Sequence, residues 1–111
     1  MQSVNPTPGE YRTSNPLDSH KGGFRWETVS GTILCDGIFG LRETYTWFLT
    51  HIGTGRTVGR YPTRRKAYEA AAQLAALKLP WDAKTLREWK ARLRDKEGKK
   101  AVAIIEKYGY R

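Results

Sequence analysis

Residues 53–75, GTGRTVGRYPTRRKAYEAAAQLA, contain a turn, a strand and the start of a helix within one short stretch. The Gly-Thr-Gly sequence at the beginning predicts a hairpin turn, because glycine adopts the positive φ that tight turns require. A strand is expected over 56–61, and Thr63, directly after Pro62, is expected to cap a helix over 63–79. Alanine and leucine recur along this helix at helical spacing, so we expect a small-residue face that packs closely on a sheet.

The stretch upstream, residues 24–52, shows the patterns of β-strands. Over residues 24–29, apolar and polar side chains alternate with the period of a half-buried strand. Asp36-Gly37 lies between two short apolar runs and predicts a tight hairpin turn, whose central residues need positive φ. Residues 44–52 are rich in threonine, aromatic and branched side chains, as strands are. Together these segments predict an antiparallel sheet of three or four strands, packed by the one alanine-rich helix.

The two ends of the chain differ in character. Residues 1–23 carry several prolines and glycines without an apolar period, which predicts a flexible N-terminal arm. After Pro80, apolar residues recur at i, i+3 and i+7, which predicts a helix that begins at Asp82 and runs to about residue 97. Gly98 is expected to end or kink this helix, before a final short helix that closes at Gly109.

The fold class expected from these segments is α+β. Behind the arm over 1–23, residues 24–111 are expected to form a single βββα-type domain that is extended by two C-terminal helices. A chain of 111 residues ordinarily forms one domain, so no further division is expected.

The composition excludes several classes of protein. Cys35 is the single cysteine, so no disulfide within the chain can staple a secreted domain. One thiol with two histidines does not complete a structural zinc site, and neither a metal nor another cofactor is expected. The chain starts without the basic and apolar regions of a signal peptide, and no stretch is apolar enough to span a membrane. A cytoplasmic location is expected, or the host cytoplasm if the chain is phage-encoded.

The sequence contains no arrangement typical of a catalytic site. His20 falls in the predicted arm, and His51 falls in a strand without a serine, cysteine or carboxylate at a known catalytic spacing. Cys35 precedes Asp36, whose charge raises rather than lowers the pKa of a thiol. The Gly-Thr-Gly sequence at 53–55 is too short to be a phosphate-binding Walker loop. We therefore expect that the chain is not an enzyme and binds no small-molecule substrate.

The net charge of +9, from 20 Lys and Arg against 11 Asp and Glu, indicates a polyanionic partner. Three cations occupy the first turn of the alanine-rich helix, where they oppose the helix dipole. An anion bound at that helix end would offset this repulsion, because helix N-termini bind phosphate. The residues expected to bind nucleic acid are Arg56, Arg60, Arg64, Arg65 and Lys66.

Residues 82–111 carry much of the remaining positive charge and form a predicted secondary basic surface. Its members are Arg87, Arg94, Lys99 and Lys100. These C-terminal helices either contact the same partner or only complete the core, and the sequence leaves both uses open.

The stretch from Gly59 to Tyr68, GRYPTRRKAY, followed by further alanines, resembles the C-terminal half of double-stranded-RNA-binding domains. In that family a glycine-rich turn precedes Ser-Lys-Lys at the start of an alanine-rich helix. The resemblance places Thr63 at the serine, and Arg64 and Arg65 at the phosphate-binding lysines. The same stretch is similar to DNA-binding domains of the ethylene-response-factor and phage-integrase type, in which three strands precede a helix. Over about residues 44–79, both resemblances imply duplex DNA or RNA as the partner.

A second interpretation makes the chain an interaction module. Small basic proteins of phages and mobile elements bind and modulate a larger acidic host protein, and a helical tail with exposed aromatic residues suits such contacts. Trp81 and the helix over 82–97 would then form the contact. Binding to a membrane surface is not expected, because the apolar stripe of the C-terminal helices is narrow and is needed for the core.

Overall fold

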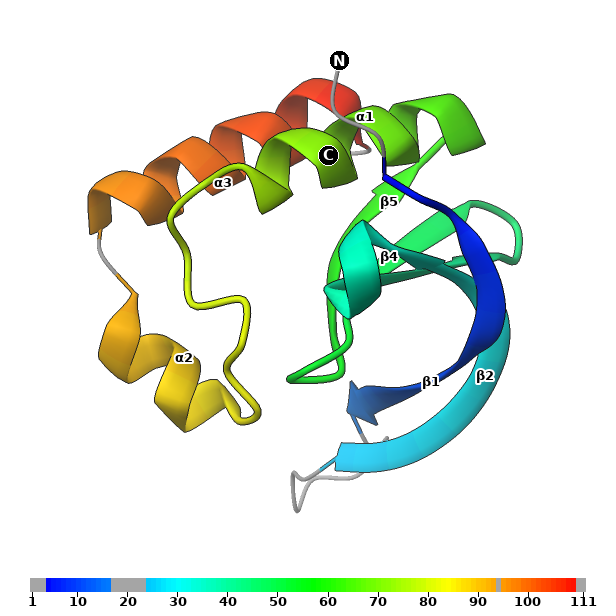
Figure 1. Ribbon diagram of the computed structural model, residues 1–111, viewed down its shortest axis with the longest axis horizontal. Helices are drawn as coiled ribbons and strands as arrows, with labels where there is room; N and C mark the ends of the chain where they lie inside the picture. Colours follow the sequence, from blue (N-terminus) through cyan, green and yellow to red (C-terminus); the bar gives the residue numbers. More distant parts are fainter. Residues whose placement is uncertain (1–3, 17–23, 94, 110–111) are drawn as a thin grey trace.

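The fold is seen in a computed structural model, which describes residues 4–16, 24–93 and 95–109 (Figure 1). Five strands form one antiparallel sheet in sequence order, and they are β1 (Thr7–Pro16), β2 (Phe24–Leu34), β3 (Phe39–Glu43), β4 (Trp47–His51) and β5 (Arg56–Tyr61). The helices that follow are α1 (Arg64–Ala75), α2 (Leu86–Arg92) and α3 (Asp95–Tyr108). The α+β class with an antiparallel sheet is confirmed, but the sheet has five strands rather than three or four.

The extra strand comes from the segment predicted to be a flexible arm. That prediction is wrong for Thr7–Pro16, which forms β1 and pairs with β2 along its whole length. Val4, just before this strand, is buried, and its carbonyl accepts a hydrogen bond from the amide of Cys35 at 2.7 Å. Backbone pairing orders this segment although its sequence has no apolar period. The rest of the predicted arm, 1–3 and 17–23, lies outside the described residues.

The sheet curls until its first and last strands meet. β2 pairs with β3 only over residues 32–34, so most of the β1–β2 ribbon extends beyond β3 and bends around the sheet (Figure 1). At the far end of this ribbon, the amide of Ser14 donates to the carbonyl of Gly55, with an N···O distance of 2.7 Å. The five strands therefore make a small, partly closed barrel.

Tyr11 lies inside this curl and packs over two glycines. A Cβ atom at Gly40 would meet the Tyr11 ring at 2.5 Å, and one at Gly31 would meet the carbonyl oxygen of Leu41 at 2.4 Å. Burial raises the pKa of the Tyr11 hydroxyl, which is hydrogen-bonded to Thr50. The two glycines are needed here because any side chain would occupy space that the ring or the neighbouring strand already fills.

The opposite face of the sheet packs against α1 and forms the core. Its buried residues from the sheet and from the helix are Leu34, Phe39, Leu41, Leu49, Tyr61, Ala67, Ala70, Ala71 and Leu74. The alanines let α1 lie close to the strands, as the sequence pattern predicts. Thr63 caps α1 as expected, since its hydroxyl accepts a hydrogen bond from the amide of Lys66 at 3.2 Å. The helix ends at Ala75, a turn earlier than the predicted residue 79.

The predicted turn at Asp36-Gly37 is present as a short 3₁₀ turn, Cys35–Gly37, between β2 and β3. Cys35 and Asp36 both have φ of 55°, and Gly37 has φ of 96°. Two residues with side chains thus adopt the left-handed conformation, at a cost of roughly 1 kcal/mol or more each. The core residues Leu34 and Phe39 on either side of the turn hold it in this shape.

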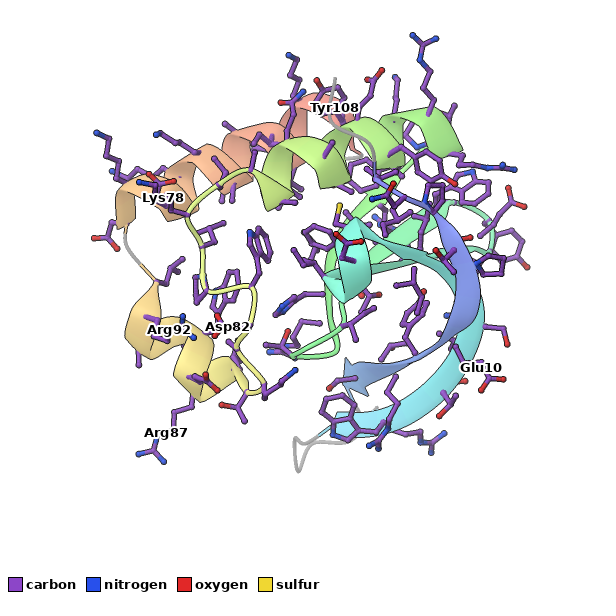
Figure 2. All side chains as sticks on the ribbon, in the orientation of Figure 1. Glu10, Lys78, Asp82, Arg87, Arg92 and Tyr108 are labelled. Carbon is purple, nitrogen blue, oxygen red and sulfur yellow. The ribbon has the colours of Figure 1, made fainter. Side chains whose placement is uncertain are left out.

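The C-terminal helices begin and end at other residues than predicted. α2 starts after Thr85, whose hydroxyl accepts from the amide of Glu88 at 3.1 Å, and not after Asp82. The carboxylate of Asp82 instead pairs with Arg92 at 2.9 Å (Figure 2). Gly98 ends no helix, because it lies inside α3. α3 runs beside α1 over the sheet (Figure 1), and Gly109 follows its last residue as predicted.

Candidate nucleic-acid interface

The N-terminus of α1 carries a cluster of exposed cations. Arg64, Arg65 and Lys66 form its first turn, and this turn contains no acidic residue. Arg60, near the end of β5, is also exposed, but its neighbour Tyr61 faces α1, so Arg60 lies on the other face of the sheet. The helix dipole adds partial positive charge at the start of α1, so the side chains of its first turn occupy a locally unfavourable position. We refer to Arg64, Arg65 and Lys66 as the basic cluster.

Neighbouring side chains hold two arginines of the basic cluster in place. The guanidinium carbon of Arg64 lies 5.3 Å from the ring centroid of Trp47, a cation–π contact. Trp47 is half-buried against the core, so its ring is fixed. Nε of Arg65 lies 3.3 Å from Oε1 of Glu69, in an exposed pair that contributes little to stability. Within the described part of the chain, neither Arg60 nor Lys66 forms an ion pair.

Arg56 does not join the basic cluster, although the sequence predicts that it does. An irregularity between β4 and β5 shifts the register, so that Arg60 lies opposite Phe48 while Arg56 lies opposite His51. Phe48 and His51 are an odd number of residues apart on one strand, so their side chains point to opposite faces. Arg56 therefore lies on the face that packs against α1 and Arg60 on the opposite face. The predicted site of five residues reduces to the three in the first turn of α1.

Arg56 instead lines a cavity of about 230 Å³ beside His51, between the sheet and the C-terminal segments. Trp81 and Trp89 form part of its wall. His51 is 3% exposed, and its Nε2 donates to the carbonyl oxygen of Trp81 at 2.6 Å. Its Nδ1 accepts from the hydroxyl of Thr54 at 2.9 Å. These bonds give both ring nitrogens a partner and connect the β4–β5 turn to the segment before α2.

The burial of His51 predicts that acid weakens the fold. Burial lowers the pKa of His51 from its ordinary value of 6.5. The unfolded chain keeps the ordinary value, so the stabilisation is complete above about pH 6.5 and is lost as pH falls through the lowered pKa. We expect the urea midpoint of unfolding to fall between about pH 7.5 and about pH 5. The fall should be smaller in His51→Gln, which cannot titrate, and an equal fall in both proteins would contradict this role of His51.

The predicted secondary basic surface is only partly available. Arg87 and Lys99 are exposed, and Arg87 points away from the rest of the molecule (Figure 2). Lys100 is paired with Glu97, with an N···O distance of 3.4 Å. Arg94 lies outside the described residues. Together these residues do not make a second cluster as dense as that at the start of α1.

Groups that could support other chemistry are few. Burial, and then the charge of Asp36, raises the pKa of the Cys35 thiol to about 11, so the thiol is protonated at neutral pH. Its Sγ donates to the carbonyl of Ala71 at 3.8 Å. In the described ranges, no three His, Cys, Asp or Glu side chains come close enough together to hold a metal ion. None of the helices there is both long and apolar enough to cross a membrane.

Sequence reasoning missed one cation on the face that carries Arg60. The register places Arg42 opposite Phe48, and Phe48 opposite Arg60, so two arginines flank one aromatic ring across three strands. Arg42 directly follows the apolar residues of β3, and the sequence holds no other sign of this pairing, because cross-strand neighbours depend on a register that strand patterns do not reveal.

Comparison of the chain with protein-family models, with curated proteins and with solved structures finds no match.

Proposed function

We propose that this protein binds a nucleic-acid duplex by its phosphate backbone, through the basic cluster at the start of α1. The observation that carries the proposal is the placement of three exposed cations, with no acidic residue, in the first turn of a well-capped helix. Each of these cations costs some tenths of a kcal/mol there, because the helix dipole repels it. A bound phosphate removes that cost and adds charge-assisted hydrogen bonds.

The chemistry of the cluster favours phosphate contacts over base reading. Arginine and lysine side chains on an exposed helix end reach phosphate oxygens, and such contacts fix position without reading sequence. The stacking of Arg64 on Trp47 orients its guanidinium group before binding, which lowers the entropy lost in the complex. The partner we propose is therefore duplex DNA or RNA, bound with little sequence preference.

The proposed role is binding without catalysis. Among groups that catalyse acyl or phosphoryl transfer, Cys35 is held protonated, and His51 spends both ring nitrogens on internal hydrogen bonds. Neither group lies in the basic cluster. In this proposal the protein acts by binding a duplex and carries out no reaction on it.

Fluorescence anisotropy with labelled blunt duplexes tests this proposal. Neutralising about three phosphates gives a slope of about −2.7 for log affinity against log salt. Raising salt from roughly 50 to 200 mM should then weaken binding about 40-fold. A slope near zero, or no binding at the lower salt, would overturn the proposal and leave an acidic protein as the partner to seek.

A further inference from the structure

A groove of about 1070 Å³ starts at the basic cluster and follows one side of α1. The helix contributes residues at positions 64, 65, 68, 69, 72 and 73, and Ala76 at its C-cap continues the same stripe. Val4, Pro6 and Tyr108 complete the lining. The volume is larger than the roughly 300–1,000 Å³ of sites for drug-sized ligands, so the groove has room for more than one nucleotide.

Two tyrosine rings line the groove beyond its basic end. Tyr68 and Tyr108 are both half-buried, so part of each side chain is open to solvent. Gln73 donates a hydrogen bond to the hydroxyl of Tyr108, which lies on the side of α3 toward α1 (Figure 2). Nζ of Lys107 lies 5.2 Å from the centroid of the Tyr108 ring. Aromatic rings next to cations are the surfaces on which proteins stack unpaired bases.

The charges of the groove suit a strand of nucleic acid better than an acidic peptide. Among the described lining residues Glu69 is the one carboxylate, and Arg65 neutralises it. Arg64 supplies positive charge at one end of the groove, while Ala72 and Ala76 leave the stretch beyond it uncharged. An acidic peptide needs cations spaced along its path, whereas an unpaired strand needs phosphate contacts and flat apolar surfaces for its bases.

We infer that the groove binds a single-stranded extension of the duplex held at the basic cluster. The inference rests on the proposed function and narrows its partner to duplexes with unpaired nucleotides at one end. The backbone of the extension passes Arg64, and its bases lie against Tyr68 and Tyr108. The exposed amide of Gln73 supplies hydrogen bonds to a base edge.

Binding of blunt and tailed duplexes tests the inference. The tailed duplex carries about four unpaired nucleotides, and the first of them is the fluorescent base 2-aminopurine. We expect about tenfold tighter binding for the tailed duplex, together with a change in 2-aminopurine fluorescence as the base stacks on a ring. The variant Tyr68→Leu with Tyr108→Leu keeps apolar contacts and should lose the tenfold gain without weaker binding of the blunt duplex. Tyr45→Leu is the matched control, because Tyr45 is fully exposed on the β3–β4 turn, and it should keep the gain.

The outcomes separate the two proposals. The inference is overturned if the blunt duplex binds as tightly as the tailed one, or if the tenfold gain is kept in the double variant. Either result leaves the proposed duplex binding at the basic cluster unaffected. A tail that binds while the blunt duplex does not would overturn the duplex role of the cluster alone. The 2-aminopurine signal is read on the unaltered protein, so an unchanged signal on saturation counts against stacking even if the double variant fails to fold.

Discussion

The variant Gly31→Ala is expected to lower the free energy of unfolding by about 3 kcal/mol, at the upper end of the cost of overpacking. The new Cβ would lie 2.4 Å from the carbonyl oxygen of Leu41 and 3.2 Å from the ring of Tyr11. The first of these atoms belongs to the backbone of the adjacent strand and cannot rotate away. Relief therefore requires β2 and β3 to separate, which breaks their short pairing over residues 32–34. Urea unfolding followed by tryptophan fluorescence measures the loss.

Gly98→Ala is the matched control for this change. A Cβ at Gly98 would meet its nearest neighbour, the side chain of Leu93, at 3.6 Å, which is ordinary contact. Glycine inside a helix is less stable than alanine by roughly 0.5–1 kcal/mol, so this variant should be more stable than the parent. The same methyl group thus has opposite effects at the two sites. A loss below about 1 kcal/mol for Gly31→Ala would show that the strands adjust more easily than overpacked cores generally do.

The second large effect is expected for duplex binding by Arg64→Ala with Arg65→Ala. Removing two phosphate contacts should reduce the salt slope by nearly two. At roughly 0.1 M salt this corresponds to about 50-fold weaker binding from counterion release alone. Anisotropy across a salt series gives both quantities from one set of titrations.

Stability and charge controls distinguish lost contacts from damage to the fold. The double variant removes cations from the positive end of the helix dipole, so its stability should stay the same or rise by some tenths of a kcal/mol. Lys78→Ala with Lys90→Ala removes the same net charge from exposed positions outside the basic cluster and should leave the salt slope nearly unchanged. If the two double variants weaken binding equally, net charge rather than the cluster attracts the duplex.

Local signals in the sequence were sufficient to predict the elements around the basic cluster. Thr63 caps α1 as predicted, and the alanine-rich face is buried on the sheet. The Asp36-Gly37 turn also lies where the sequence places it. Each of these features depends on residues close together in the chain, where capping, turn chemistry and helical spacing act directly.

Features that depend on distant partners were not predictable from those signals. β1 is ordered by its pairing with β2, in which Gly9 lies opposite Gly31. Its sequence has no apolar period from which a strand could be predicted. The separation of Arg56 from Arg60 follows from one irregular residue pair between β4 and β5. A register shift of one residue moves every later side chain to the other face of the sheet. The local sequence of β5 does not predict this shift.

The closure between β1 and β5 also bears on how the protein behaves at high concentration. An outer strand with free amide and carbonyl groups is a template for pairing with another molecule, and this is a common start of aggregation. The hydrogen bond from Ser14 to Gly55 joins β1 to the turn just before β5 at one end. At the other end α3 covers the edge of β5, where a Cβ at Gly109 would lie 2.7 Å from the carbonyl oxygen of Arg60. Both ends of the β5 edge are therefore occupied within the fold, which leaves only a short stretch of that edge for pairing with another molecule.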